Sequence, residues 1–534
     1  MQKKKINEVS RRSFLKSIGT AVVGLAVGAG VGYGAYPAIN PFAAEKTVTI
    51  TTGEGGPGGV FSIPVEGKDT HERLMNAMKY VAERDGLKGK ELVIMHPGGG
   101  SVAYDSNKEE FERETGVKLA HAEAPIGEIF EKVMLEAVSK TGEYDVFSQM
   151  PHTFGDLAES GLIAPLDDYV KWFDNRFYGM PDGYIYPLDH IMAEYQGKIY
   201  GIVQDGDVWT NYINTQMLND SSEQEGFEKQ YGYPLKIADT FEEYLDLGEY
   251  FTRADEGRFG IVELRNPTRA YLVWHVYYSS KRYPTMLPFD EDMNPLINGD
   301  EGIKATEEFI EATKYMPQDV LNWEFAVVYA TMGEGIIFES IEFPSMSNLL
   351  NDSERSKIVG NWTAATVPGS KVMGPASKEI ILKRTVQGPG WSLNVSNYSK
   401  MKDFAALYCM WLTSPEKSAV AVSAKGSWMD PCRYNHAGES ADPRVLEARG
   451  AIIPPYLKNA SIAVPVVGSG IRGGNEYATT LSRNIHAAMQ GTMDATESME
   501  RIAGEWDEIT DRIGREKQIE AWRAYMKFYP TAIV

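Results

Sequence analysis

Residues 91–116 read ELVIMHPGGGSVAYDSNKEEFERETG. The apolar run at 92–95 predicts a buried strand, the glycines at 98–100 predict a loop, and the charged segment 107–115 predicts a helix. Gly116 suits the left-handed position that often ends a helix. A second apolar segment follows at once, so this stretch predicts a β-loop-α-β unit, which is the building block of a parallel sheet.

The same pattern recurs immediately downstream. Residues 126–138 have helical spacing of apolar side chains, Gly142 follows them, and residues 144–147 form another apolar strand. Ligands bind beyond the carboxyl ends of parallel strands. The loops at residues 96–104 and 148–153 are therefore candidate binding loops in an α/β fold.

The composition is that of a large globular protein. The chain has 534 residues, 43% of them hydrophobic and 24% charged, with a formal net charge of −21. This length predicts about two to four folding units. An acidic chain repels phosphate backbones, so no nucleic-acid partner is expected. Two cysteines cannot form a disulfide-rich scaffold; Cys409 and Cys432 either pair with each other or remain free buried thiols.

The charge is unevenly distributed along the chain. The first sixteen residues hold six basic side chains and one acidic one, and the rest holds 47 basic and 73 acidic side chains, near −26. Residues 10–16 read SRRSFLK, and the uncharged residues 17–44 follow. The pair Arg11 and Arg12 before Phe-Leu resembles a twin-arginine export signal. It implies the twin-arginine translocase as a partner, and the uncharged stretch is long enough to stay as a membrane anchor if it is not cleaved.

A family resemblance extends over residues 91–510. The segments that carry it are residues 111–118, 142–147, 157–167, 197–203, 212–214, 240–244, 332–338, 391–415, 426–433 and 491–506. Their content and order are similar to those of family 1 extracellular solute-binding proteins, the maltose-binding-like group that serves ABC transporters. Glu334 replaces the usual Lys, and Trp428-Met429-Asp430 precedes the proline of the 426–433 segment, which leaves the ligand class open.

The resemblance implies a periplasmic-binding-protein fold. Two α/β lobes, each a mainly parallel sheet flanked by helices, are joined by hinge strands and close on a ligand in the cleft between them. The expected parts are residues 1–44 as signal or anchor, residues 45–89 as a glycine-rich linker with a short helix at 71–86, residues 90–205 and 364–412 as lobe I, and residues 206–363 and 413–534 as lobe II.

The resemblance also implies a function without catalysis. We expect the extracytoplasmic solute-binding component of an ABC importer, a monomer that captures a carbohydrate or polyol and delivers it to the permease subunits. Its expected location is the periplasm or the outer face of the cytoplasmic membrane. A non-sugar solute, including a cationic one, is the alternative within the class, and a carbohydrate-active enzyme is the alternative outside it.

The candidate ligand-binding residues suit a sugar. Aromatic rings pack on the C–H faces of sugars, while carboxylates and arginines bind the hydroxyl groups. The residues at expected strand ends and crossovers are Tyr104, Asp205, Asp207, Trp209, Glu339, Trp391, Trp428, Asp430 and Arg433. Each has an alternative role: core packing for the tryptophans, turn formation for Asp205 and Asp207, and pairing with Asp430 for Arg433.

No cofactor or metal is expected from the sequence. Residues 468–473 match G-x-G-x-x-G, but Pro465 interrupts the preceding strand and no second β-α unit follows. The eight histidines are scattered without the spacing of metal ligands. Asp205 and Asp207 are a pair that could serve a glycosidase, although their spacing alone does not establish the required separation.

Overall fold

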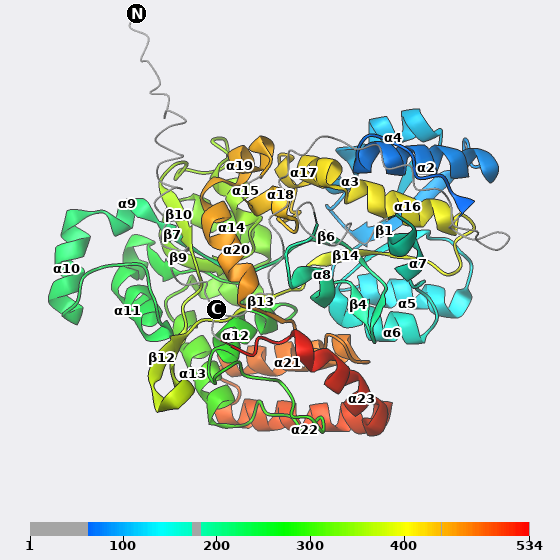
Figure 1. Cartoon of the computed structure of the whole chain (residues 1–534). Helices are drawn as coiled ribbons and strands as arrows, with labels where there is room; N and C mark the ends of the chain where they lie inside the picture. The colour runs from blue at the N-terminus through cyan, green and yellow to red at the C-terminus, as the bar shows by residue number, and fades with distance from the viewer. Residues whose placement is uncertain (1–61, 174–182, 439–440, 533–534) are drawn as a thin grey trace, which may run out of the picture. The chain divides into compact units, whose positions relative to one another are not determined.

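The computed structural model describes residues 62–173, 183–438 and 441–532 (Figure 1). All of them belong to one compact unit, residues 49–534. The expected signal or anchor at residues 1–44 and the glycine-rich stretch at 53–59 lie outside the described residues.

The predicted β-loop-α-β unit is confirmed in the first sheet. β1 (Glu91–Pro97) and β2 (Lys118–Ala124) pair in parallel. α4 (Lys108–Thr115) connects them, and Gly116 ends this helix with a φ of 73°. The strand order of the sheet is β2-β1-β3-β14-β6, with β3 (Val146–Gln149), β14 (Trp391–Val395) and β6 (Ile202–Asp205). β14 is antiparallel to both of its neighbours.

The second predicted repeat differs in how its helix ends. α5 (Ile129–Ser139) ends at Lys140, which takes the left-handed conformation in place of Gly142. Gly142 also has a positive φ, 67°. A Cβ there would lie 2.4 Å from the carbonyl oxygen of Tyr398, so glycine is needed for close packing as well as for the turn.

A helix that precedes the first strand packs as part of this lobe. α2 (Thr70–Arg84) matches the predicted helix at 71–86, and the Asp69 carboxylate accepts a hydrogen bond from the Glu72 N–H at 2.8 Å. Its apolar face is buried against α16. The other helices of this region are α3 (Val102–Asp105), α6 (Phe154–Glu159), α7 (Asp167–Phe173), α8 (Leu188–Ile191), α16 (Lys402–Leu412) and α17 (Pro415–Ser423).

The second sheet has the order β10-β7-β9-β8. Its strands are β10 (Trp362–Ala365), β7 (Thr210–Asn214), β9 (Ile337–Glu342) and β8 (Phe259–Ile261). β8 and β9 are parallel, whereas β7 is antiparallel to β9 and to β10. In this sheet β10, β9 and β8 share one direction and β7 opposes them, just as β14 opposes the other strands of the first sheet, so the expectation of mainly parallel sheets holds for both. A strand that enters from the other lobe, as β7 does, has no same-sheet helical crossover to make it parallel.

Helices and short strands complete the second lobe. The helices are α9 (Thr215–Leu218), α10 (Ser221–Tyr231), α11 (Phe241–Phe251), α12 (Ala270–Ser279), α13 (Asp300–Thr313), α14 (Phe325–Gly333), α15 (Met346–Leu350), α18 (Tyr434–Ala437), α19 (Pro443–Arg449), α20 (Ile453–Ser461), α21 (Gly474–Met489), α22 (Ala495–Ile513) and α23 (Arg515–Tyr525). The short strands of the chain are β4 (Glu194–Tyr195), β5 (Lys198–Ile199), β11 (Ser370–Met373), β12 (Glu379–Leu382), β13 (Thr385–Gln387) and β15 (Ala463–Pro465).

Two of the places where the chain crosses between the lobes lie side by side. Residues 206–209 lead from β6 to β7, and residues 388–390 lead from β13 to β14. Val208 and Gln387 form an antiparallel bridge between the crossings. Gly206 has to be glycine, because a Cβ there would lie 2.1 Å from the carbonyl oxygen of Pro431.

The return crossing corrects one predicted lobe boundary. β10 runs through the expected boundary between residues 363 and 364. Gly369 bridges to Thr240, and the Ser370 hydroxyl hydrogen-bonds that of Ser280 at 2.9 Å. Residues 364–387 therefore pack with the second lobe, because the chain turns back at the 388–390 crossing. The remaining boundaries stay a proposal.

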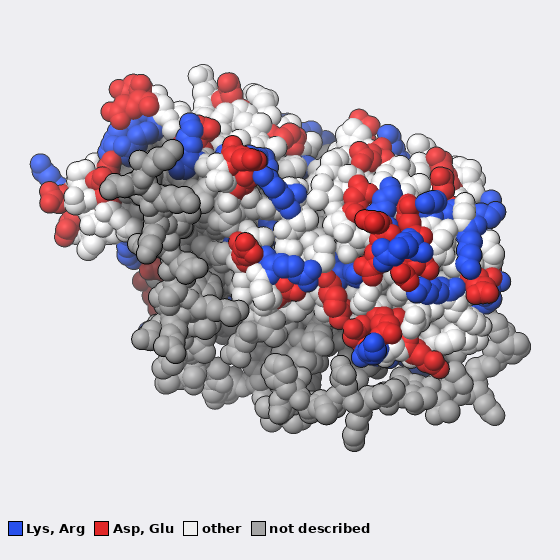
Figure 2. All heavy atoms as spheres, turned by 90° about the horizontal axis from the view of Figure 1, so that it is seen from above, with Lys and Arg blue, Asp and Glu red and all other residues white. Residues whose placement is uncertain are grey.

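Charged side chains of both signs share the surface. Figure 2 shows lysine and arginine intermixed with aspartate and glutamate on the face that is viewed from above. Lys79 pairs with Glu114, and Arg84 Nη2 lies 2.8 Å from Asp403 Oδ2. Such exposed pairs contribute about 0–1 kcal/mol each, so the acidity of the chain serves mainly to keep its surface hydrated.

Buried acids in the second sheet make stability depend on pH. Glu339 in β9 is fully buried; Asn211 Nδ2 donates to its Oε2 at 3.3 Å, and its Oε1 has no partner among the described residues. Burial raises the pKa of Glu339 well above 4.5, and the charge of Glu263 adds to this. Because the folded-state pKa is the higher one, the contribution of Glu339 to stability is complete below pH 4.5 and is lost as the pH rises through the raised value.

Replacing Glu339 by glutamine removes this titration. We expect Glu339→Gln to gain stability relative to the wild type by about 1.4 kcal/mol per pH unit, from the ordinary pKa up to the raised one. Urea unfolding of both proteins between pH 4.5 and about 8 measures the difference. Parallel stability curves over this range would contradict the burial of a titrating carboxyl group.

One further prediction concerns the two cysteines. Cys409 and Cys432 are both free and buried, so the thiol alternative is the correct one. No helix within the described part of the chain is long and apolar enough to cross a membrane.

Candidate binding cleft

A cleft of about 220 Å³ lies beside the two crossings. Its walls come from β6, β14, the loops after β3 and β9, and the first turns of several helices. The lining residues are Ile126, Gly127, Phe130, Glu131, Met150, His152, Asp205, Asp207, Pro267, Thr268, Arg269, Tyr271, Leu272, Phe325, Tyr329, Phe343, Ser345, Pro389, Trp391, Trp428, Asn475, Ala478 and Thr479. The lining therefore combines residues from both lobes.

Four of the predicted ligand-binding residues line this cleft. They are Asp205, Asp207, Trp391 and Trp428. The loop at 148–153, predicted from the strand-end rule, contributes Met150 and His152. The loop at 96–104 contributes no lining residue and instead supports Trp428.

Trp391 is the first residue of β14, and its side chain contacts both the core and the cleft. Its side chain is 4% exposed and packs in a core cluster with Met95, Phe147 and Met150, while one surface lines the cleft. Because strand pairing and the core cluster hold Trp391 on both sides, its ring is a rigid wall of the cleft.

Trp428 connects segments of the two lobes. Its indole Nε1 donates to the carbonyl oxygen of Gly99 at 2.8 Å, and its ring stacks on Phe325 with centroids 5.7 Å apart. A Cβ at Gly100 would lie 3.3 Å from this ring, so the glycine loop lets the indole approach the backbone. Trp428 is half-buried and keeps one face toward the cleft.

Asp205 and Asp207 flank Gly206 at the floor of the cleft. Asp205 Oδ1 accepts the Asp430 N–H at 2.6 Å, and Asp207 Oδ2 accepts the Gly390 N–H at 3.0 Å. Burial raises the pKa of Asp207 to about 6. It raises that of Asp205 well above 3.8, and the neighbouring Asp207 charge adds to the shift. The side chains thus form an acidic floor that also fixes the loop.

Three other predicted residues support the cleft from behind. Tyr104 folds into α3, and its hydroxyl donates to Gln204 Oε1 at 3.1 Å. Trp209 Nε1 donates to the Gly388 carbonyl oxygen at 2.9 Å, which joins the two crossings. Asp430 is fully buried below Asp205 and Asp207.

The last two predicted residues also lie outside the lining. Glu339 is buried in the second sheet, where Asn211 binds it. Arg433 lies over the ring of Tyr184, with its guanidinium carbon 3.9 Å from the ring centroid, and its Nε donates to the Thr413 carbonyl oxygen at 2.7 Å. Pairing with Asp430 was one alternative for Arg433; the arginine that the structure places near Asp430 is Arg449, whose Nη1 lies 3.9 Å from Asp430 Oδ1.

Several lining residues lie outside the set predicted from the sequence. Arg269 precedes α12, pairs with Glu324 at 3.0 Å and lies over the Phe325 ring at 5.1 Å. Asn475 and Thr479 lie in the first turns of α21. The sequence just before α21 is the glycine-rich match at 468–473, which indicates a loop before a helix but no binding role for the helix itself.

That glycine-rich loop has a packing role. Gly473 precedes α21 with a φ of 72°, and its N–H donates to Asp156 Oδ1 at 3.0 Å. A Cβ at Gly474 would lie 1.9 Å from the His152 carbonyl oxygen. The glycines therefore bring α21 against the loop after β3, and so place both at the cleft.

Known proteins share this architecture. Residues 108–440, more than half of the chain, match the family described as bacterial extracellular solute-binding protein. A curated relative from Sinorhizobium fredii, a probable amino-acid ABC transporter periplasmic-binding protein, is 21% identical over 61% of this chain and 69% of its own length.

Solved structures show the same two-lobed fold. An ABC transporter solute-binding protein from Agrobacterium radiobacter in complex with ribitol has a TM-score of 0.66 and 17% identity, covering 79% of this chain and 99% of that one. T. maritima MalE3 with bound maltose has a TM-score of 0.63 and 17% identity, covering 79% and 100%. A protein from Agrobacterium vitis with bound D-mannitol has a TM-score of 0.62 and 16% identity, covering 80% and 99%.

The chain belongs to the bacterial extracellular solute-binding protein family. The family resemblance found in the sequence and the two-lobed α/β fold are thereby confirmed.

Proposed function

We propose that this protein captures a sugar or polyol in the cleft and delivers it to the permease subunits of an ABC importer. The observation that supports this most is the lining itself, where Trp391 and Trp428 meet the carboxylates of Asp205 and Asp207. Flat indole rings suit the C–H faces of a polyhydroxylated ligand, and carboxylates accept hydrogen bonds from its hydroxyl groups.

The crossings give the binding event a mechanical consequence. Two short connections, residues 206–209 and 388–390, join the lobes beside the cleft. A solute that contacts both walls binds the closed arrangement more tightly than the open one, so it shifts the population toward closure. A permease can then distinguish the loaded protein from the empty one.

The ligand class has support from relatives. Ribitol, maltose and D-mannitol are bound in the structurally similar proteins described above. We therefore place polyols and small saccharides first among candidate solutes.

A cationic solute is the second candidate. Asp205 and Asp207 lie on the cleft floor, and the curated relative is named a probable amino-acid transporter component. An ammonium group on the solute would compensate Asp205 and Asp207, neither of which forms an ion pair with a lysine or arginine among the described residues.

Catalysis is not part of the proposal. The Asp205 and Asp207 oxygens converge with Asp430 within 4.8 Å of one another, whereas glycosidase carboxylates flank the scissile bond. Incubation with candidate glycosides and a search for products tests this directly; any product formed in proportion to the protein would overturn it.

Thermal unfolding with a solute panel tests the proposed ligand class. At one hundred times its dissociation constant, a true ligand stabilises the protein by about 2.7 kcal/mol. We expect such a shift with a polyol or sugar and none with amino acids or amines. A shift with amines alone would favour the cationic alternative. If no sugar or polyol in the panel shifts the unfolding transition, the proposal is contradicted.

The remaining sequence predictions belong to the same proposal. They are export by the twin-arginine translocase through Arg11 and Arg12, retention or cleavage of residues 1–44, and a monomeric state. The family assignment supports an extracellular or periplasmic location.

A further inference from the structure

Three buried aspartates converge beneath the cleft. Asp205, Asp207 and Asp430 each offer a carboxylate oxygen, and these oxygens all lie within 4.8 Å of one another. Their side chains are 2%, 6% and 0% exposed. Asp205 and Asp207 also reach the cleft, whereas Asp430 lies behind them.

Asp430 has a carboxylate without a hydrogen-bond donor from outside the acidic cluster. No backbone N–H, hydroxyl or basic side chain of a described residue donates to either of its oxygens, although the side chain is completely buried; its hydrogen-bonding neighbour is the Asp207 carboxyl group, another acid of the cluster. The nearby Tyr456 hydroxyl instead donates to the backbone carbonyl oxygen of Gly206 at 2.5 Å. A fully buried carboxylate whose only such neighbour is another acid is costly, and it calls for a cation or a proton.

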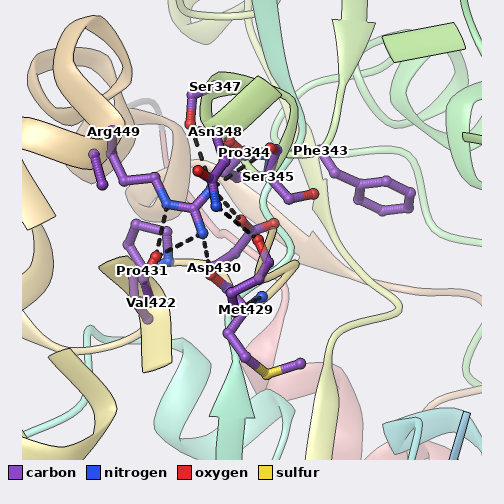
Figure 3. Close-up of polar contacts among 12 residues, drawn as sticks. Phe343, Pro344, Ser345, Ser347, Asn348, Val422, Met429, Asp430, Pro431 and Arg449 are labelled. Atoms are coloured by element: carbon purple, nitrogen blue, oxygen red, sulfur yellow. Dashed lines mark hydrogen bonds and ion pairs between the residues drawn. The ribbon is translucent and has the colours of Figure 1, made fainter. Parts of the chain in front are cut away.

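The neighbouring arginine gives only partial compensation. Figure 3 shows Arg449 extending toward Ser347 and the backbone around Asp430. Its Nη2 donates to the carbonyl oxygens of Val422 at 2.8 Å and Met429 at 2.5 Å. Nη1 remains 3.9 Å from Asp430 Oδ1, so the guanidinium is engaged elsewhere.

Charge balance identifies the missing partner. Three carboxylates carry three negative charges, and Arg449 supplies one positive charge beside them. One divalent cation makes the group neutral. Without it the buried aspartates have to hold protons, because uncompensated charge is costly in the interior.

Distance and ligand chemistry identify the kind of cation. Carboxylate oxygens are preferred by hard cations, and Ca²⁺ binds them at about 2.3–2.6 Å. Two oxygens on opposite sides of one Ca²⁺ are about 4.8 Å apart, so every pair in this cluster can share an ion. Mg²⁺ binds at about 2.0–2.1 Å and demands a near-ideal octahedral geometry, which a buried cluster of three carboxylates satisfies less readily than the flexible geometry of Ca²⁺.

We propose that Asp205, Asp207 and Asp430 bind one Ca²⁺ ion at the floor of the cleft. Ca²⁺ takes about 6–8 oxygen ligands, so the three carboxylates leave positions open on the side of Asp205 and Asp207. The hydroxyl groups of a bound polyol complete this coordination; this step rests on the proposed function. The ion would thereby link solute recognition to the 206–209 crossing.

Calorimetry on the whole protein without solute tests the site alone. The protein is treated with EDTA, dialysed, and titrated with CaCl₂ and separately with MgCl₂. We expect one Ca²⁺ per chain, weaker Mg²⁺ binding and a higher melting temperature with Ca²⁺. No Ca²⁺ binding up to about 10 mM, ten-fold above the weakest extracellular sites, would overturn the proposal and leave a proton-sharing cluster.

Variants assign the site to the aspartates. Asp430→Asn, whose side chain does not line the cleft, should weaken Ca²⁺ binding by at least about 100-fold, because changes beyond the ligands themselves cost about 10–100-fold. Asp145→Asn is the matched control, since Asp145 is a buried aspartate 6% exposed that lies outside the cluster. If Asp430→Asn does not fold, Asp207→Asn takes its place; equal Ca²⁺ affinity in a folded variant would contradict the assignment.

Solute titrations with Ca²⁺ and with EDTA separate the two proposals. A polyol that binds at least about ten-fold more tightly with Ca²⁺, about 1.4 kcal/mol, supports the coordination. Ca²⁺ binding without any sugar binding would leave the ion site intact and refute the proposed function. Sugar binding that is unaffected by EDTA, in a protein that binds no Ca²⁺, would leave the proposed function intact and refute the Ca²⁺ site.

Discussion

Replacing Arg265 by methionine lowers the free energy of unfolding by about 3–5 kcal/mol. Arg265 Nη2 lies 2.6 Å from Glu263 Oε2, and both side chains are fully buried. Its guanidinium carbon also lies 3.6 Å from the centroid of the Phe309 ring. The variant leaves the Glu263 carboxylate uncompensated in the core of the second lobe, close to the buried Glu339 and Glu342.

Urea unfolding measures this loss against two further proteins. The double variant Arg265→Met, Glu263→Gln should recover most of it, because no unpaired charge remains. Arg512→Met removes an exposed ion pair with Glu476 and should cost no more than about 1 kcal/mol. A single Arg265→Met variant as stable as Arg512→Met would show that the buried pair does not carry this part of the fold.

Replacing Trp428 by alanine raises the dissociation constant of the solute about 30-fold, or about 2 kcal/mol. The change removes the aromatic face that lines the cleft and the hydrogen bond from Nε1 to Gly99. It also removes the stacking partner of Phe325. Trp428→Phe keeps an aromatic ring and loses the hydrogen bond, so its affinity for the solute should fall between those of the wild type and Trp428→Ala.

Trp362→Phe is the control for this experiment. Trp362 lies in β10 outside the cleft, packs on Tyr212 and is 6% exposed. Its variant should bind the solute as the wild type does. Isothermal titration of folded proteins gives the constants; an unchanged dissociation constant in Trp428→Ala would exclude this tryptophan from solute binding.

The first sheet could be predicted because its signals are local. An apolar run, a helix and Gly116 follow one another within a short stretch, and β1, α4 and β2 form there. The direction of β7 could not be predicted in this way. It depends on the crossing from the other lobe, which no local spacing records, and the same holds for the return crossing at residues 388–390.

The candidate site could be predicted in part for the same reason. Asp205 ends β6, Asp207 follows it, and Trp391 begins the neighbouring strand β14. Arg269 and Phe325 reach the cleft from separate helices, so their sequence neighbours give no sign of it. Tyr104 has a binding-loop pattern, but α3 packs its ring into the core.

The acidic cluster shows how much three-dimensional proximity adds. In the sequence Asp205 and Asp207 form a pair, whereas Asp430 follows more than two hundred residues later. Their convergence depends on Gly206, which lets the Pro431 backbone approach the crossing. The possibility of a shared ion therefore arises from the fold and could not be predicted from the spacing.

Isothermal titration of the Ca²⁺-saturated wild-type protein with ribitol, D-mannitol and maltose tests the central claim most directly. The account predicts that at least one of these polyhydroxylated solutes, or a close relative, binds at one site per chain. It also predicts that Trp428→Ala weakens this binding while Trp362→Phe does not. Absence of heat with every sugar and polyol, together with saturable binding of an amine or amino acid, would contradict it.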